Sequence, residues 1–116
     1  MALKLITPAH VAGNVEITVP GSEQLGSLKV RFAYQTAKAH DTWRDTAIAD
    51  ASSGKRTMTQ ILAPVVIGWD GLEDDAGAPV VYSVEALDEL LDRYPASAGE
   101  LFRGYTRVLT ESRVKN

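Results

Sequence analysis

The stretch from Thr57 to Gly77 constrains the fold of this chain most, because it holds the most apolar run and then ends in a polar turn. Its larger apolar residues recur at i, i+3, i+4, i+7, i+8 and i+11, a spacing that places them on one face of an α-helix. These residues are Met58, Ile61, Leu62, Val65, Val66 and Trp69. The spacing predicts a helix that is kinked or restarted at Pro64, with Trp69 largely buried on its apolar face.

A buried strand is the alternative for the second half of this stretch. Val65–Ile67 is a β-branched run, and Pro64 lacks the backbone N–H that a continuing helix needs. From the sequence alone, helix and strand therefore both remain open at Pro64–Ile67. In either case the chain must turn at Asp70 and Gly71, because these residue types favour turns.

The residues before this stretch predict a β-hairpin. Val15–Val19 alternates apolar and polar side chains, as a half-buried strand does, and Pro20 ends it. Leu25–Tyr34 supplies the second strand, with its larger apolar side chains on one face. Residues 1–14 show little periodicity and are predicted to form a flexible N-terminal arm. The single domain then covers residues 15–116.

Capping residues and apolar stripes predict the remaining helices. Thr36 is a suitable N-cap for a helix that runs to about residue 50. Ser83 begins a further helix, and Ser97 with Glu100 forms a capping-box pattern that begins the last. Together with the central stretch, this gives a hairpin followed by about four helices, an α+β arrangement.

The composition excludes several classes of function. The chain has 116 residues, which suffices for one domain with a modest core, and its formal net charge of -3 argues against binding a phosphate backbone. It contains no cysteine, which excludes disulfides, thiolate metal sites and cysteine nucleophiles. Its longest apolar run, Ile61–Trp69, is too short to span a bilayer. We therefore expect no nucleic-acid partner, no membrane partner and no cofactor.

The few candidate chemical sites have simpler interpretations. The acidic residues Glu73–Asp75 lie in a turn-rich loop, but Leu72 occupies a position where a calcium loop starting at Asp70 needs an oxygen ligand. We therefore predict a solvated turn there. Gly54–Thr57 lacks the spacing of a phosphate-binding loop. His40 is interpreted as a surface histidine, because no nucleophile lies near it in sequence.

Several short motifs follow one another in a fixed order along most of the chain. A hairpin ends in Phe32–Tyr34, an apolar stretch runs into Val65–Gly71, and Ser83–Leu91 opens a helix after an acidic turn. Tyr94-Pro95 then leads into the last helix. This order, over about residues 15–116, resembles the tail assembly chaperones of long-tailed, siphovirus-like bacteriophages.

The resemblance implies a non-enzymatic role in phage or prophage tail assembly. By that likeness, we expect the protein to bind and solubilise the tape measure protein and to recruit tail tube subunits. It would act in the host cytoplasm and be absent from the mature virion. The unpaired edges of the predicted hairpin also favour self-association into a ring or spiral.

The apolar stripes of the central stretch and the last two helices are predicted to supply the partner or oligomer interface, because they look broader than a monomer this small needs. The residues are Trp69, Leu87, Leu90, Leu91, Phe102, Tyr105 and Leu109. Some of them must form the core, and the sequence leaves open which ones face a partner.

Other functions remain open from the sequence. A small structural virion protein, such as a tail or head–tail joining subunit, would share the size and the hairpin but would stay in purified particles. A small regulator of a host protein is a second alternative. An enzyme is the least favoured, because the sequence holds no nucleophile–base pair, metal cluster or phosphate loop.

Overall fold

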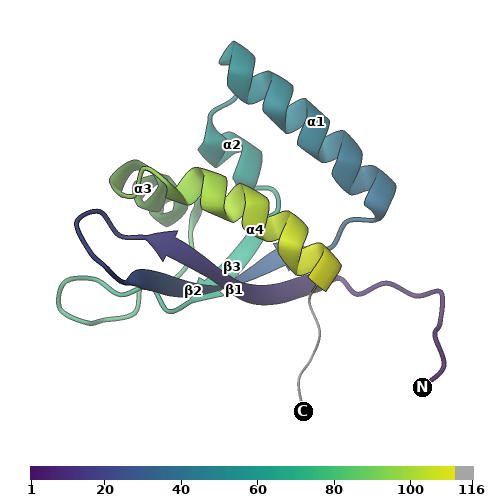
Figure 1. The fold of residues 1–116 in the computed structure, drawn as a ribbon, viewed down its shortest axis with the longest axis horizontal. Helices are drawn as coiled ribbons and strands as arrows, with labels where there is room; N and C mark the ends of the chain where they lie inside the picture. The colour runs from purple at the N-terminus through teal and green to yellow at the C-terminus, as the bar shows by residue number, and fades with distance from the viewer. Residues whose placement is uncertain (112–116) are drawn as a thin grey trace.

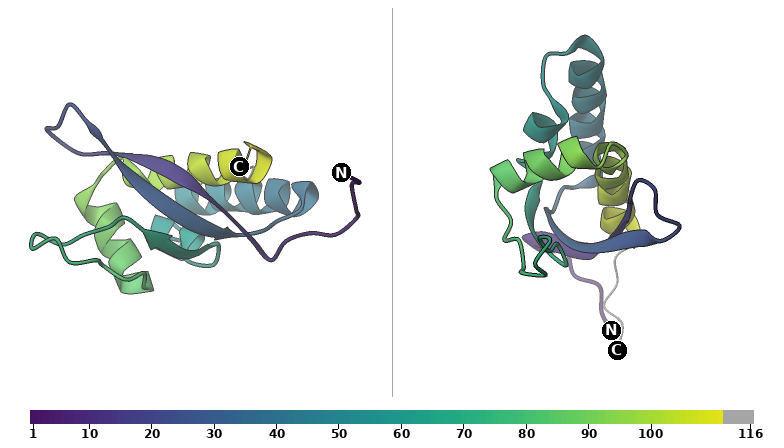
Figure 2. Two further views of the ribbon diagram at one scale, coloured as in Figure 1. Left: turned by 90° about the horizontal axis from the view of Figure 1, so that it is seen from below. Right: turned by 90° about the vertical axis from the view of Figure 1, so that its left-hand side faces the viewer.

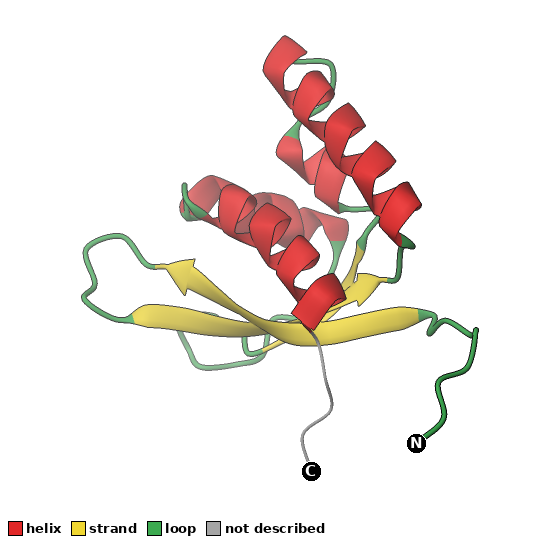
Figure 3. Ribbon diagram, turned by 45° about the vertical axis from the view of Figure 1, so that its right-hand side comes forward, coloured by secondary structure: helices red, strands yellow, loops and turns green. Residues whose placement is uncertain are grey.

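A three-stranded antiparallel sheet carries the helices on one of its faces in the computed structural model, which describes residues 1–111 (Figure 1). The chain runs β1 (His10–Thr18), β2 (Leu25–Ala33), α1 (Ala37–Ser53), α2 (Met58–Leu62), β3 (Val66–Asp70), α3 (Val84–Arg93) and α4 (Ser97–Glu111). Figure 3 shows the two layers, with α4 lying along the sheet and α1 farthest from it. Within these residues the predicted α+β fold, a hairpin and about four helices, is confirmed. The polar tail expected from Arg113, Lys115 and Asn116 lies outside the described residues.

The hairpin forms as predicted, but its first strand begins earlier. β1 pairs antiparallel with β2 from His10↔Ala33 to Thr18↔Leu25. Alternate residues point to the helices and are buried, namely Val15, Ile17, Leu28, Val30 and Phe32. Because residues 10–14 pair with β2, the N-terminal arm predicted over residues 1–14 is confined to residues 1–9, which extend past the end of the sheet (Figure 2).

The central stretch divides into a short helix and a strand. Thr57 caps α2 in a capping box: its Oγ1 accepts from the Gln60 N–H at 3.2 Å, and the Gln60 side chain accepts from the Thr57 N–H at 2.9 Å. The helix ends at Leu62, and Val66–Asp70 pairs with β2 as β3. The helix predicted to run through Trp69, kinked or restarted at Pro64, is therefore wrong, and the strand alternative is correct.

The combination of Pro64 with the open edge of β2 explains why Val66–Asp70 forms a strand. Pro64 has no N–H to continue the helix, and the β-branched residues after it pack well in a sheet. The Ala33 N–H then donates to Val65 O at 2.8 Å, next to the point where the β2–β3 pairing begins. A tertiary partner thus decided between two conformations that the local sequence allows.

A β-bulge in β3 explains why its buried residues also fit a helical period. The register shifts between Arg31 and Phe32 of β2, which makes Ile67 the additional residue. Val66 and Trp69 both face the core in consequence, with 2% and 4% exposure. In a regular strand, residues three apart point to opposite faces.

Two glycines let α4 approach β1 closely. An ideal Cβ on Gly13 would lie 2.7 Å from Val108 Cγ2, and one on Gly104 would lie 3.0 Å from Val15 Cγ2. Larger residues at these positions would push the helix away from the strand. The buried side chains of Val15 and Val108 lie in this close contact between β1 and α4.

Glu100 holds the first turn of α4 against the end of β1 and does not close a capping box. Its carboxylate accepts from the Thr18 N–H at 3.0 and 3.1 Å and from Thr18 Oγ1 at 2.6 Å. Ser97 Oγ donates to Tyr94 O at 2.7 Å. The helix begins at Ser97 as predicted, but the predicted capping box is wrong because β1 takes the carboxylate.

His40, interpreted from the sequence as a surface histidine, is only 5% exposed. Its Nδ1 lies 3.0 Å from Gln35 Oε1, and its Nε2 lies 2.7 Å from Thr106 Oγ1. Gln35 accepts through its carbonyl oxygen, so Nδ1 carries the proton and Nε2 accepts from the Thr106 hydroxyl. The interpretation was wrong because α4, far away in sequence, covers this part of α1.

The buried His40 makes stability depend on pH. Burial lowers the pKa of His40 below its ordinary value of 6.5, and the positive charge of Arg44 adds to this effect. As pH falls, the unfolded chain therefore takes up the proton before the folded chain does. We expect the contribution of the buried neutral His40 to the free energy of unfolding to be complete above pH 6.5. That contribution is lost as the pH falls from 6.5 through the lowered pKa of His40.

Urea denaturation at about pH 7.5 and about pH 5.5 checks this prediction. The decrease should be smaller in His40→Gln than in the wild-type chain. His10→Gln is the matched control, because His10 is exposed. Equal decreases in the wild type and in His40→Gln would contradict the assignment to His40.

Candidate partner-binding surfaces

Most residues predicted for a partner interface lie in the core of the monomer. Those with at most 4% exposure are Trp69, Leu87, Leu90 and Tyr105. Leu91 and Leu109 are partly buried and pack against the core, and the partly buried Phe102 stacks on Trp43. The stripes on the last two helices are broad because these helices contact the rest of the monomer from several sides, so the fold itself uses most of them.

Trp69 fixes the segment after the acidic loop beside β3. Its indole Nε1 donates to Val80 O at 2.9 Å, and its ring meets the Tyr82 ring edge-on at 4.8 Å. Burial raises the pKa of Tyr82, whose hydroxyl finds no hydrogen-bond partner among residues 1–111. The predicted burial of Trp69 is confirmed, and its role is structural.

An aromatic cluster joins α1 to α4 and reaches the surface there. Trp43 stacks on Phe102 at 5.3 Å and meets the fully buried Tyr105 edge-on at 5.2 Å. Trp43 and Phe102 are themselves partly exposed. Leu109, also partly exposed, lies about two turns along α4 from Phe102. We refer to Trp43, Phe102 and Leu109 as the aromatic surface.

A groove of about 550 Å³ opens between α3 and the loop that follows β3. Its apolar lining residues are Leu72, Val80, Ala86, Leu90 and Tyr94. Its charged lining residues are Glu73, Asp74, Asp75, Glu89 and Arg93. We refer to this site as the acidic groove. An adjoining hollow of about 230 Å³ continues it toward Ile17 and Val19 at the end of β1.

Hydrogen bonds within the acidic loop fix one wall of this groove. Asp74 Oδ1 accepts from the backbone N–H groups of Ala76 and Ala78, both at 2.9 Å. Residues 73–79 are exposed, so the predicted solvated turn is confirmed. The charges therefore face solvent at the rim, while the floor is apolar.

Several apolar residues outside the helical stripes are exposed and were not predicted from the sequence. Leu3, Leu5 and Ile6 of the N-terminal arm are exposed, as are Ile67 and Val81 near the edge strand β3. These positions belong to no helical stripe, so helical periodicity does not identify them. The alternation around Lys4 was the available signal for the arm.

Residues 1–111 contain no group of His, Cys, Asp or Glu side chains arranged to hold a metal ion. No helix in that range combines the length and the apolar character that a membrane crossing requires.

A family model described as phage tail assembly chaperone matches residues 1–116. No curated protein and no solved structure matches the chain. The matched range includes the arm, the sheet and all the helices described above.

Proposed function

The chain belongs to the phage tail assembly chaperone family, and we propose that it binds and solubilises the tape measure protein and recruits tail tube subunits during tail assembly. The role of this family lies in assembly and not in catalysis. We place its action in the host cytoplasm of a siphovirus-like phage or prophage, and we expect it to be absent from the mature virion.

The aromatic surface is the main structural support for partner binding. Phe102 and Leu109 are seven residues apart on α4, the repeat at which a partner helix presents its apolar side chains. Trp43 extends this surface onto α1 by its stacking on Phe102. Partly buried aromatic residues are typical anchors of protein interfaces. A long helical protein with an apolar stripe is therefore a suitable partner.

Co-expression with the tape measure protein of the same phage tests the proposal. The wild-type chain should keep that protein soluble and co-purify with it, and Phe102→Asp should abolish both effects. Ile48→Asp is the matched control, since Ile48 is a 51% exposed apolar residue of α1 outside the aromatic surface. Thermal unfolding must show that both variants remain folded, and Leu109→Lys provides a second test of the same surface.

Equal solubility of the tape measure protein with and without the chain would overturn the proposal. The structural virion subunit would then be the better interpretation. Mass spectrometry of purified virions separates the two, because a virion subunit is present in the particles and an assembly chaperone is not.

We further propose that the chain associates with itself into a ring or spiral. In the described residues, β1 and β3 are edge strands of the sheet, each with a neighbour on one side. Such edges, like exposed apolar segments, favour contacts between copies. The tail tube protein is the other partner in this proposal, and the acidic loop is the candidate surface for a basic patch on it.

A further inference from the structure

The N-terminal arm carries apolar side chains that its own chain leaves exposed. Leu3 is 96%, Leu5 is 106% and Ile6 is 78% exposed. Single apolar side chains are common on protein surfaces, but a cluster of this kind marks an interaction site. Figure 1 shows that the arm leaves the start of β1 and runs away from the sheet and helices.

The charges of the arm and of the acidic groove are complementary. The arm carries Lys4, and the first acidic residue of the chain is Glu16. The groove lining carries Glu73, Asp74, Asp75 and Glu89, and its cation Arg93 is already paired with Glu89 at 2.6 Å. An apolar segment with a positive charge therefore suits this groove, which has an apolar floor and an acidic rim.

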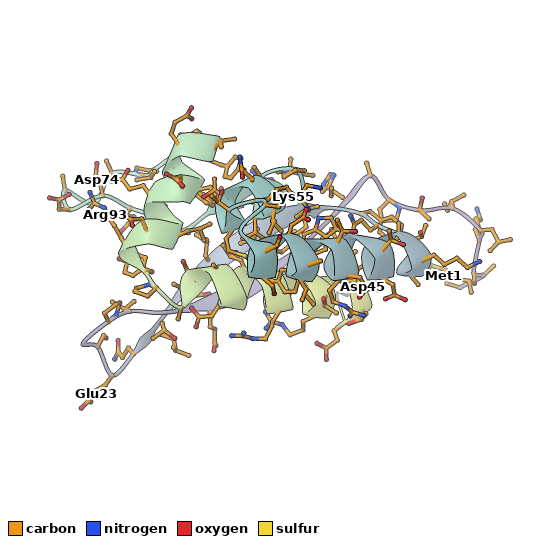
Figure 4. The ribbon with its side chains drawn as sticks, turned by 90° about the horizontal axis from the view of Figure 1, so that it is seen from above. Met1, Glu23, Asp45, Lys55, Asp74 and Arg93 are labelled. Atoms are coloured by element: carbon orange, nitrogen blue, oxygen red, sulfur yellow. The ribbon has the colours of Figure 1, made fainter. Side chains whose placement is uncertain are left out.

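The arm cannot place its whole apolar cluster in the groove of its own chain, because Ile6 does not reach it. In Figure 4, Met1 lies at one end of the molecule, and Asp74 and Arg93 lie at the opposite end. On the sheet, the nearest lining residue of the hollow that continues the groove is Leu28, which pairs with Val15, about 17 Å from His10 along β1. Ile6 can lie at most about 14 Å from His10, because each residue spans no more than about 3.5 Å.

We propose that the arm of one copy occupies the acidic groove of the next copy. Leu3, Leu5 and Ile6 would lie on the apolar floor, and Lys4 would face Glu73 and Asp75. The contact joins different surfaces of the two copies, so it repeats head to tail and produces a ring or an open spiral. This inference rests on the self-association proposed above and assigns surfaces to it.

Sedimentation velocity on full-length chains tests this contact. The arm variant is Leu3→Ser with Leu5→Ser, and the groove variant is Glu73→Lys with Asp75→Lys; all four positions are exposed and outside the core. We expect the wild-type chain to form assemblies larger than a dimer as its concentration rises. Each variant should bind itself about tenfold or more weakly than the wild type does.

Mixing the two variants is the decisive measurement. The arm variant keeps an intact groove, and the groove variant keeps an intact arm. An equimolar mixture should therefore form a one-to-one dimer and nothing larger, because one functional contact remains. Ile48→Ser, and Glu23→Lys with Asp45→Lys, are matched controls for hydrophobicity and charge on exposed residues away from both surfaces, and they should associate like the wild type.

Each contrary outcome has a distinct meaning. If the wild-type chain stays a monomer at every concentration, both the self-association and this inference are overturned, while binding to the tape measure protein is judged by co-expression alone. If the wild type and the arm variant associate equally, self-association stands and the arm is not the occupant. Loss of association in both variants without recovery in the mixture also overturns the arm–groove contact. The groove variant could also lose the ability to solubilise the tape measure protein and still associate with itself. That result would overturn the arm–groove contact, because the groove would then bind the tape measure protein and not the arm.

Discussion

Replacing Trp69 by alanine is expected to lower the free energy of unfolding by roughly 3–5 kcal/mol. The side chain is 4% exposed in the core, and its removal leaves a cavity between β3 and the segment after the acidic loop. The variant also loses the hydrogen bond from Nε1 to Val80 O. A domain of this size has a total stability of about 5–15 kcal/mol, so the loss is a large fraction of it.

Urea denaturation of Trp69→Ala measures this loss. Trp43→Ala is the matched control, because Trp43 is partly exposed and should cost less when it is truncated. Trp69→Phe keeps an aromatic ring near Tyr82 and should lie between Trp69→Ala and the wild type. Unchanged unfolding of Trp69→Ala would show that the indole does not support the core.

Tyr105→Ala is expected to cost a similar amount, roughly 3–5 kcal/mol. Tyr105 is 0% exposed, stacks on Phe32 at 4.8 Å and meets Trp43 and His40 edge-on. Its hydroxyl donates to Ala33 O at the end of β2, and burial raises its pKa to about 12. The side chain therefore joins α1, α4 and the sheet.

Tyr105→Phe separates the ring from the hydroxyl in the same denaturation experiment. It removes the hydrogen bond to Ala33 O and should cost about 0.5–1.5 kcal/mol. A loss for Tyr105→Ala no larger than that for Tyr105→Phe would contradict the assignment of the ring to the core.

The burial pattern divides the apolar residues of the last two helices into those buried in the core and those left partly exposed. Leu87, Leu90 and Tyr105 are needed by the monomer, whereas Phe102 and Leu109 remain partly exposed. Substitutions at the first group should therefore affect stability, and substitutions at the second should affect partner binding more than stability. The N-terminal arm adds further exposed apolar side chains at Leu3, Leu5 and Ile6.

Features governed by neighbouring residues could be predicted from the sequence alone. The alternation in Val15–Val19 and Leu25–Tyr34 predicted the hairpin, because a strand must place apolar side chains on one face. The caps at Thr36 and Ser83 were also predicted, and each side chain accepts a hydrogen bond from the backbone N–H three residues later. The order of motifs was sufficient to indicate the family.

Features governed by distant residues were decided only by the tertiary structure. The residues after Pro64 became a strand because β2 offered an open edge, and Glu100 turned to Thr18 because β1 ends beside α4. His40 is buried because Thr106 covers it from another helix. Periodicity identifies an apolar face but not the surface that covers it, so the division between buried and exposed apolar residues depended on how the helices pack on the sheet.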